Sequence, residues 1–180
     1  MQRRKIRVGI LTFSDGRDFV NKELEDINRE FQERLAAALE ATGEVQVLVT
    51  NTIIWTTELA QAEAKRLASE GCEVTIFNFA VWSFPHLAVI AAQFAPGPFL
   101  LFSNINPQYP GMVGMLASAG ALDQIGVFHG RLFGDISNPQ VLRKVLAFVR
   151  AGAAVNRLKG ETFGLFGGRP MGMYTVVANP

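Results

Sequence analysis

The sequence predicts an α/β fold in which a parallel sheet is covered by helices on both faces. Short apolar runs alternate with longer amphipathic segments, which is typical of successive strand–helix units. Hydrophobic residues make up 49% and charged residues 18% of the 180 positions, as expected for a buried sheet. Cys72 is the single cysteine, so no internal disulfide can form, and a chain of this length buries enough surface to need none.

The chain begins with an apolar run, a polar turn and a long amphipathic helix. Residues 6–11 have strand composition, residues 14–17 (Ser-Asp-Gly-Arg) form the turn, and Asp18 is predicted to cap the helix. One apolar stripe identifies this helix: Val20, Leu24, Ile27, Phe31, Leu35 and Leu39. Because the loop after the first strand lies at the carboxyl edge of such a sheet, Arg17 can offer a cation to a ligand there. The alternative is an arginine that is only solvated in a turn.

Four further strands and helices follow in alternation. The strands are predicted at residues 45–49, 73–79, 99–102 and 126–128, and the last helix opens at Asn138-Pro139. The buried side of that helix is predicted to consist of Val141, Val145, Phe148, Val149 and Val155. Five strands joined by right-handed helical crossovers give a doubly wound, flavodoxin-like sheet with the order 2-1-3-4-5 and helices on both faces.

Residues 161–180 do not fit this scheme. Residues 162–166 have the composition of one more strand, and a turn with Gly167, Gly168 and Gly172 follows. They form either a sixth strand on the sheet edge or the opening strand of a second α/β domain. Because the glycine turn resembles the start of another strand–helix unit, we interpret residues 1–160 as the first domain and residues 161–180 as the beginning of an incomplete second one.

Charge and motif content exclude several classes of function. The net charge is +1, from 17 basic and 16 acidic residues without a basic stripe, which disfavours binding to nucleic acid or membrane surfaces. We recognise no signal peptide and no bilayer-spanning run, so we expect a cytoplasmic protein. Neither a P-loop nor a G-x-G-x-x-G motif follows the first strand, and Asp15 in that loop would repel a phosphate. His86 and His129 lack metal-ligand spacing with any carboxylate pair.

What remains is a set of polar and aromatic side chains predicted on loops at the carboxyl edge of the sheet: Arg17, Trp82, Asn104, Asn106, Tyr109, His129 and Arg131. A tryptophan there can stack on the apolar face of a sugar ring, while arginine and asparagine bind its hydroxyl groups. No general acid–base pair accompanies them. The alternative is that Trp82 and Phe84 only close the edge of the core.

A series of short motifs spans nearly the whole chain: Asp15-Gly16-Arg17, the loop around Trp82, Pro110-Gly111 before a helix of small residues, residues 150–155 (Arg-Ala-Gly-Ala-Ala-Val) and residues 165–173 (Leu-Phe-Gly-Gly-Arg-Pro-Met-Gly-Met). In order and spacing they resemble the amino-terminal region of the L-fucose isomerase/L-arabinose isomerase family. The Phe-rich exit of the third strand departs from the fucose isomerase pattern.

This resemblance implies a metal-dependent aldose–ketose isomerase that works through an ene-diol, typically with Mn²⁺. In the family, two carboxylates and a histidine from later domains bind the metal and move the proton, while the first domain completes a neighbouring subunit's substrate pocket. By matching motifs, the resemblance assigns substrate contacts to Arg17, Trp82 and Met171. Asn104, Tyr109, His129 and Arg131 are possible rim residues because of their expected loop positions, and His129 matches no family motif. It also implies a homotrimer or homohexamer, and no activity for these 180 residues alone.

Two other functions stay open at this point. One is a stand-alone flavodoxin-like module that binds a sugar or supports assembly without catalysis, since doubly wound sheets carry many unrelated functions. The other is a flavin or phosphate binder. The sequence does not discriminate among fucose, arabinose and related sugars.

Overall fold

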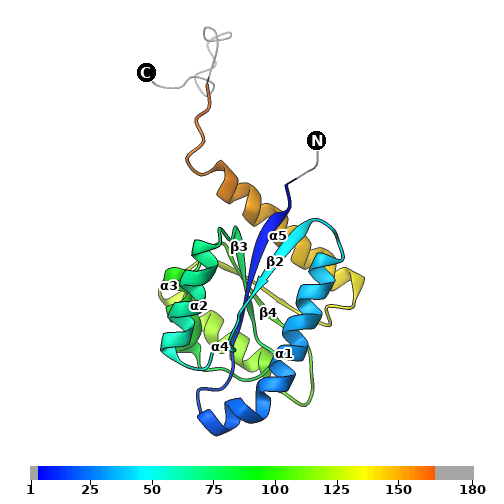
Figure 1. Cartoon of the computed structure of the whole chain (residues 1–180), viewed down its shortest axis with the longest axis vertical. Coiled ribbons are helices and arrows are strands. Elements are labelled where there is room, and N and C mark those ends of the chain that lie inside the picture. The colour runs from blue at the N-terminus through cyan, green and yellow to red at the C-terminus, as the bar shows by residue number, and fades with distance from the viewer. Residues whose placement is uncertain (1–3, 165–180) are drawn as a thin grey trace.

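A computed structural model describes residues 4–164 of the chain. Five parallel strands form one sheet with the order β2-β1-β3-β4-β5, as predicted. The strands are β1 (Ile6–Thr12), β2 (Val45–Val49), β3 (Val74–Asn78), β4 (Phe99–Ser103) and β5 (His129–Phe133). Their carboxyl ends all lie at one edge of the sheet, which is the lower edge in Figure 1.

Each crossover between strands contains a helix. The helices are α1 (Asp18–Glu40), α2 (Thr57–Ser69), α3 (Pro85–Phe94), α4 (Gly111–Gln124) and α5 (Pro139–Leu158). Helices α1 and α5 cover one face of the sheet, and α2, α3 and α4 cover the other (Figure 1). The doubly wound, flavodoxin-like α/β fold predicted from the sequence is therefore confirmed.

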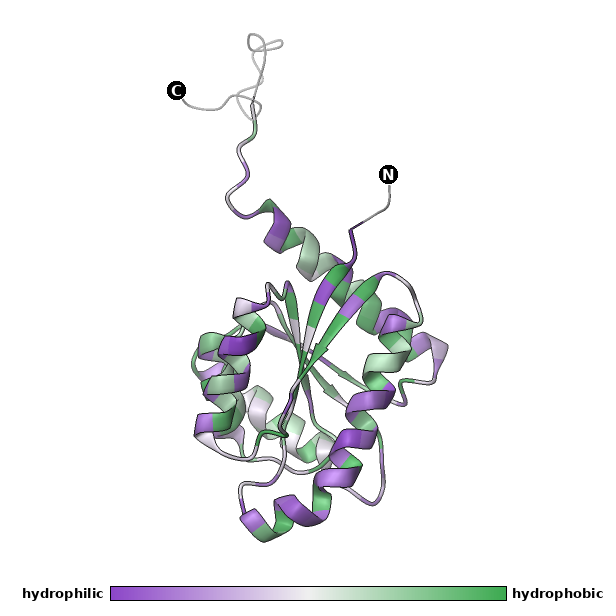
Figure 2. Ribbon diagram, viewed as in Figure 1, coloured by the Kyte–Doolittle hydropathy of each residue, from purple (hydrophilic) through white to green (hydrophobic). Residues whose placement is uncertain are grey.

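Alternating side chains of each strand pack into two separate apolar layers. Ile10 and Ile76 face α1 and α5, whereas Leu11 and Phe77 face α2, α3 and α4. The central strands are therefore apolar on both sides, and β3 and β4 are buried along their whole length. Figure 2 shows this as mostly green strands at the centre of the molecule, with purple stretches on the surrounding helices, among them α1 and α2.

Several local predictions differ from the structure. The fifth strand was predicted at residues 126–128, but β5 is His129–Phe133, an edge strand whose residues are only partly buried or exposed. Asp18 does not cap α1; the N-cap is Arg17, without a side-chain hydrogen bond, and Asp18 instead pairs with Lys22 at 2.8 Å. Val155 is 52% exposed rather than buried, because the last turns of α5 extend beyond the sheet (Figure 1).

Two further observations concern the strand predicted at residues 162–166 and the question of a membrane-spanning helix. Within the predicted strand 162–166, residues 162–164 form neither strand nor helix, and the remaining two lie outside the described residues. Among residues 4–164, no helix combines the length and apolar character needed to cross a membrane.

Candidate functional site at the carboxyl edge of the sheet

The loops that leave β1, β2 and β3 lie against one another at the carboxyl edge. Gly16, in the turn after β1, is so close to the next loops that a Cβ atom there would lie 3.1 Å from the Phe84 ring and 3.5 Å from the Trp55 carbonyl oxygen. The Phe84 ring in turn meets the edge of the Trp82 ring, with 6.0 Å between centroids. A side chain at position 16 would therefore push against the Phe84 ring, so glycine lets the Arg17 turn lie close beside the aromatic loop.

Arg17 is held in place by the carboxylate two residues before it. The Asp15 side chain is only 2% exposed. Its carboxylate accepts hydrogen bonds from the backbone N–H of Arg17 at 3.0 Å and from Nε and Nη2 of the Arg17 side chain at 2.8 Å each. These hydrogen bonds hold the pKa of Asp15 below its ordinary value and outweigh burial, which raises it. The same pairing raises the pKa of Arg17.

The Asp15–Arg17 pair changes how the first loop can bind a ligand. The carboxylate no longer faces solvent as a free negative charge, whereas the Arg17 side chain is 59% exposed. Asp15 occupies N–H groups on Nε and Nη2, so the N–H groups of Nη1 remain for a ligand. Sequence reasoning found Arg17 but missed Asp15 as its orienting partner, although the one-residue spacing in Asp-Gly-Arg was a usable signal.

Trp82 lies in the loop between β3 and α3 and is partly buried. Its ring contacts Phe84 edge-on, and Phe84 also lies 6.0 Å from the His86 ring, measured between centroids. Phe84 itself is 37% exposed, so the loop presents a continuous aromatic surface beside the Arg17 turn. Such a surface suits the apolar face of a sugar ring.

Two glycines at the start of α4 allow that helix to back the aromatic loop. A Cβ atom on Gly111 would collide with the carbonyl oxygen of Phe79, and one on Gly114 would lie 2.8 Å from the backbone nitrogen of Ser83. Both neighbours are main-chain atoms, which cannot rotate away as a side chain can. The helix rich in small residues therefore supports the Trp82 loop from the side of β4.

The loop after β4 contributes a small cavity to the same edge. The cavity has a volume of about 210 Å³ and is lined by residues that include Asn104, Asn106, Tyr109 and Met112. Asn104 is 6% exposed, and its Oδ1 has no hydrogen-bond partner among the described residues. The predicted rim residues Asn104, Asn106 and Tyr109 are thus gathered here.

Buried polar side chains lie beneath this edge, between the strand ends and α1. Asn78 at the end of β3 donates from Nδ2 to the Thr12 hydroxyl at 3.1 Å, and its Oδ1 is left without a partner in the described part of the chain. On α1, Asn28 is fully buried, with no described partner for either polar atom of its side chain. Buried polar groups of this kind are normally hydrogen-bonded to ordered water or to a ligand. The layer of side chains directly beneath the carboxyl edge is therefore polar.

His129 and Arg131 are not where the sequence placed them. His129 opens β5 and pairs with Phe99 at the start of β4, and Arg131 pairs with Leu101 in the middle of that strand. Their predicted place on a loop at the carboxyl edge is therefore wrong. Arg131 Nη2 forms a short ion pair with Asp123, and its Nε donates to His129 Nε2 at 3.1 Å. A half-buried edge strand can carry such polar residues, which is why its sequence looked like a loop.

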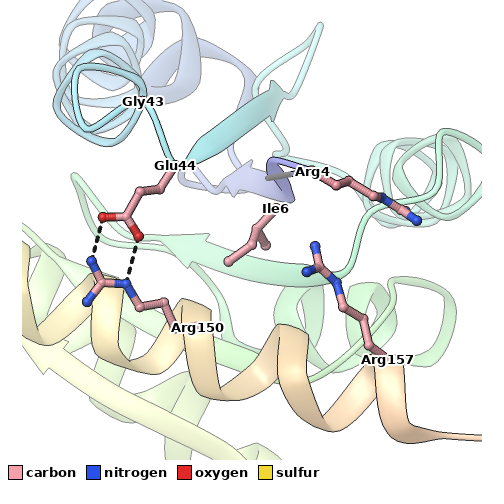
Figure 3. Close-up of a pocket in the computed structure, with 6 residues that line it drawn as sticks. All are labelled: Arg4, Ile6, Gly43, Glu44, Arg150 and Arg157. Atoms are coloured by element: carbon pink, nitrogen blue, oxygen red, sulfur yellow. Dashed lines mark hydrogen bonds and ion pairs between the residues drawn. The ribbon is translucent and has the colours of Figure 1, made fainter. Parts of the chain in front are cut away.

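A larger cavity of about 650 Å³ lies at the opposite, amino edge of the sheet (Figure 3). Arginines dominate its lining, but Arg150 is bound to both carboxylate oxygens of Glu44, and Arg157 donates to Glu73 at 2.6 Å. By volume alone this cavity would be the better candidate for a functional site. The carboxyl edge, however, brings aromatic, cationic and amide side chains together. We place the candidate site at the carboxyl edge.

The described residues do not form a metal centre. Across residues 4–164, no group of three or more His, Cys, Asp or Glu side chains is arranged to hold a metal ion. The described residues therefore do not fit Mn²⁺. Met171, predicted as a substrate contact, lies outside the described residues.

Comparison with known proteins gives two findings. Residues 5–160 match the sequence model of a family described as "L-fucose isomerase, first N-terminal domain". A curated relative, the L-fucose isomerase of Salmonella arizonae, is 27% identical over 182 aligned positions, which cover 93% of this chain and 30% of the relative. The chain thus spans less than a third of that relative's length.

Proposed function

Because the chain belongs to the L-fucose isomerase family through its match to the first N-terminal domain, we propose that it forms the substrate-orienting part of an aldose–ketose sugar isomerase. The proposal assigns it no proton transfer and no metal binding. It rests on one observation: Arg17, held in place by Asp15, lies beside the loop that carries Trp82 and Phe84 at the carboxyl edge of the sheet.

Arg17 and Trp82 are the proposed sugar contacts in the described structure. Asp15 fixes the guanidinium at two nitrogens, so Arg17 can offer its remaining N–H groups to sugar hydroxyls with little further loss of side-chain freedom. The Trp82 and Phe84 rings supply the apolar surface against which a pyranose or open-chain sugar can lie. Together they bind and orient the sugar and exclude water from it. Met171 remains a proposed third contact from the segment that follows.

The acid–base and metal chemistry is proposed to come from outside this chain. A divalent metal such as Mn²⁺ held there would supply Lewis-acid chemistry, which the described residues do not offer. Its ligands would lie in the part of the polypeptide that corresponds to the remaining length of the Salmonella arizonae enzyme. The rim formed here then completes a pocket whose other wall belongs to another part of a homo-oligomer, a trimer or hexamer in a cytoplasmic protein.

The proposal is tested by titrating the ¹⁵N-labelled chain with L-fucose and, separately, L-arabinose. We expect weak binding that shifts the Arg17 Nε–H and Trp82 indole N–H resonances together with backbone signals of residues 13–17 and 79–84. Arg17→Ala should abolish these shifts, whereas Arg143→Ala, which removes an exposed arginine on α5, should preserve them. Shifts that survive Arg17→Ala, or an absence of shifts with both sugars, would contradict the proposal.

An activity assay tests the other half of the proposal. With Mn²⁺ added, the 180-residue chain should not interconvert L-fucose and its ketose, and the metal should not raise its melting temperature. Isomerase activity of the chain alone would show that it contains its own acid–base groups.

A further inference from the structure

Three arginines line the cavity at the amino edge of the sheet, on the side of the molecule opposite the candidate sugar site. We call it the amino-edge cavity. It lies between α5 and the amino ends of β1 and β2 (Figure 3). Its volume of about 650 Å³ is within the range of about 300–1,000 Å³ that is usual for small-molecule sites. Its lining consists of Arg4, Ile6, Gly43, Glu44, Arg150 and Arg157.

Two of the arginines lie on the same face of α5. Arg150 and Arg157 are seven residues apart, which is about two helical turns, so their side chains leave α5 on one side. A rise of about 1.5 Å per residue separates their Cα atoms by about 10.5 Å along the helix axis. Figure 3 shows them on either side of Ile6. The cavity thus has two cationic ends with an apolar side chain between them.

Two glutamates orient these arginines without occupying all of their donors. Glu44 accepts hydrogen bonds from Arg150 Nε at 2.8 Å and Nη2 at 2.5 Å. Glu73 accepts hydrogen bonds from Arg157 Nε at 2.6 Å and Nη2 at 3.2 Å. Both pairings leave the N–H groups of Nη1 for a ligand. Because the two arginine side chains are 55% and 43% exposed, a ligand can reach them from solvent.

The charge that the cavity presents is positive. The Glu73 side chain is only 10% exposed, and its carboxylate also accepts the Arg7 backbone N–H at 3.0 Å. Arg4 is exposed and forms no hydrogen bond or ion pair with the other five residues drawn in Figure 3. The three arginines of the lining therefore outnumber the two carboxylates paired with them, and the less exposed carboxylate is already saturated with donors.

The helix ends at this edge weaken the positive charge only slightly. The carboxyl ends of α1 and α5 lie here, and the free carbonyl groups of a helix end carry partial negative charge. In α1, however, the carbonyl oxygens of Ala37, Leu39 and Glu40 accept hydrogen bonds from the backbone N–H groups that follow the helix. In α5, those of Asn156 and Leu158 are satisfied in the same way. These carbonyl groups are therefore not free to repel an anion.

We propose that the amino-edge cavity binds a small organic molecule with an anionic group at each end, either two phosphates or two carboxylates. One anionic group binds Arg150, the other binds Arg157 and Arg4, and the carbon chain between them lies against Ile6. The planar guanidinium group forms paired hydrogen bonds with phosphate and with carboxylate oxygens alike, so the two ligand classes share one chemistry. An anion with a single charged group reaches only one end of the cavity.

Titration of the ¹⁵N-labelled 180-residue chain tests the proposal. The probes are fructose 1,6-bisphosphate, which has phosphate ends, and adipate, which has carboxylate ends. At least one should shift the Nε–H resonances of Arg150 and Arg157 and the backbone signal of Gly43, with a dissociation constant below about 1 mM at low salt. Inorganic phosphate should bind at least about tenfold more weakly, and uncharged fructose should leave these signals unchanged. The probe that binds more tightly identifies the anionic group.

Two variants remove donors without leaving a buried charge unpaired. Arg4→Gln removes the exposed arginine, and the double variant Arg150→Gln/Glu44→Gln removes both members of an exposed ion pair. Each should weaken binding of the two-ended probe at least about fivefold, because charge-assisted hydrogen bonds are lost. Arg157 is left in place, since it neutralises the largely buried Glu73. Circular dichroism checks that both variants are folded.

Arg143→Gln is the matched control. Arg143 is exposed and lies seven residues before Arg150 on the same face of α5, but it does not line the cavity. Its substitution removes one positive charge from the same helix and should leave the affinity unchanged. If Arg143→Gln weakens binding as much as Arg4→Gln does, the probes respond only to overall charge and the proposal is wrong.

Two other results would overturn the inference. One is that neither two-ended probe shifts the signals of Arg150, Arg157 and Gly43. The other is that inorganic phosphate binds as tightly as the two-ended probes, which would mean that the two ends do not act together. The inference does not depend on sugar binding, because the L-fucose titration monitors Arg17 and Trp82 at the opposite edge of the sheet. Either proposal can therefore fail without the other.

Discussion

Replacing Gly114 by alanine should destabilise the protein, although alanine is the better helix former. Gly114 lies in the first turn of α4, against the loop that carries Trp82. An added Cβ atom would lie 2.8 Å from the Ser83 nitrogen and 3.4 Å from the Trp82 Cα and the Val81 carbonyl oxygen. All three are main-chain atoms, so the helix and the loop must move apart.

The size of the effect follows from two opposing contributions. Helix propensity favours alanine over glycine by about 1 kcal/mol. Overpacking a well-packed site costs about 1–3 kcal/mol, and a contact with main-chain atoms belongs at the upper end of that range. The expected net loss in the free energy of unfolding is therefore about 1–2 kcal/mol. The Gly114→Ala variant should also displace Trp82 and weaken the sugar-dependent shifts.

Urea unfolding followed by circular dichroism measures this loss, with Gly120→Ala as the control on the same helix. Since a Cβ atom on Gly120 meets nothing within 4 Å, that substitution should stabilise the monomer by about 0.5–1 kcal/mol. Both variants should be measured at low micromolar protein concentration, so that self-association does not contribute to the measured free energy of unfolding. A Gly114→Ala protein as stable as wild type, or more stable, would refute the argument that the helix and the loop touch through the backbone.

Three further predictions concern titratable groups. Burial raises the pKa of Glu73, but hydrogen bonds from Arg157 and from the Arg7 backbone N–H, together with nearby arginine charges, lower that pKa below its ordinary value. The stabilisation from Glu73 is therefore present above its ordinary pKa and lost on acidification; Glu73→Gln should cost about 1 kcal/mol at pH 7 and less at pH 3, whereas exposed Glu33→Gln should cost little at either pH in urea titrations. In Arg17→Ala, Asp15 keeps its burial and the hydrogen bond from the backbone N–H of residue 17 but loses the side-chain hydrogen bonds that most lower its pKa, so the variant should lose stability relative to wild type as pH rises above 3.8; a parallel pH profile for both proteins would contradict this. Burial raises the pKa of the Cys72 thiol, so an aromatic disulfide reagent should react slowly with native protein at pH 8 and fast in urea, and equal rates would show that the thiol is accessible.

The parts of the fold that the sequence predicts best are those buried on both sides. Strands β3 and β4 are short, mostly apolar and fully buried, and the predicted limits differ from the observed ones by one residue at each changed end. The fifth strand was misplaced because it lies at the sheet edge. Gly130 faces α5, where a Cβ atom would lie 2.6 Å from the Phe148 ring, while the Arg131 side chain is 41% exposed. Periodicity cannot identify a strand whose core-facing position is occupied by glycine.

The candidate site was predictable only as far as the order of loops along the chain allows. Topology places the ends of β1, β3 and β4 at one edge, so Arg17, Trp82 and Asn104 were correctly expected there. The ion pair of Asp15 with Arg17 and the approach of Gly16 to Phe84 depend on side-chain directions and loop conformations, which local sequence does not specify.

Helix α4 determines where the Trp82 loop lies, because its inner side touches the main chain of that loop. A Cβ atom on Gly111 would collide with the Phe79 carbonyl oxygen, and one on Gly114 would lie 2.8 Å from the Ser83 nitrogen. Close-packed contacts transmit small displacements, so a change at the start of α4 should also change the position of Trp82. Gly111 and Gly114 are therefore best understood as a requirement of this close contact, whereas a Cβ atom on Gly120 would meet no described atom within 4 Å.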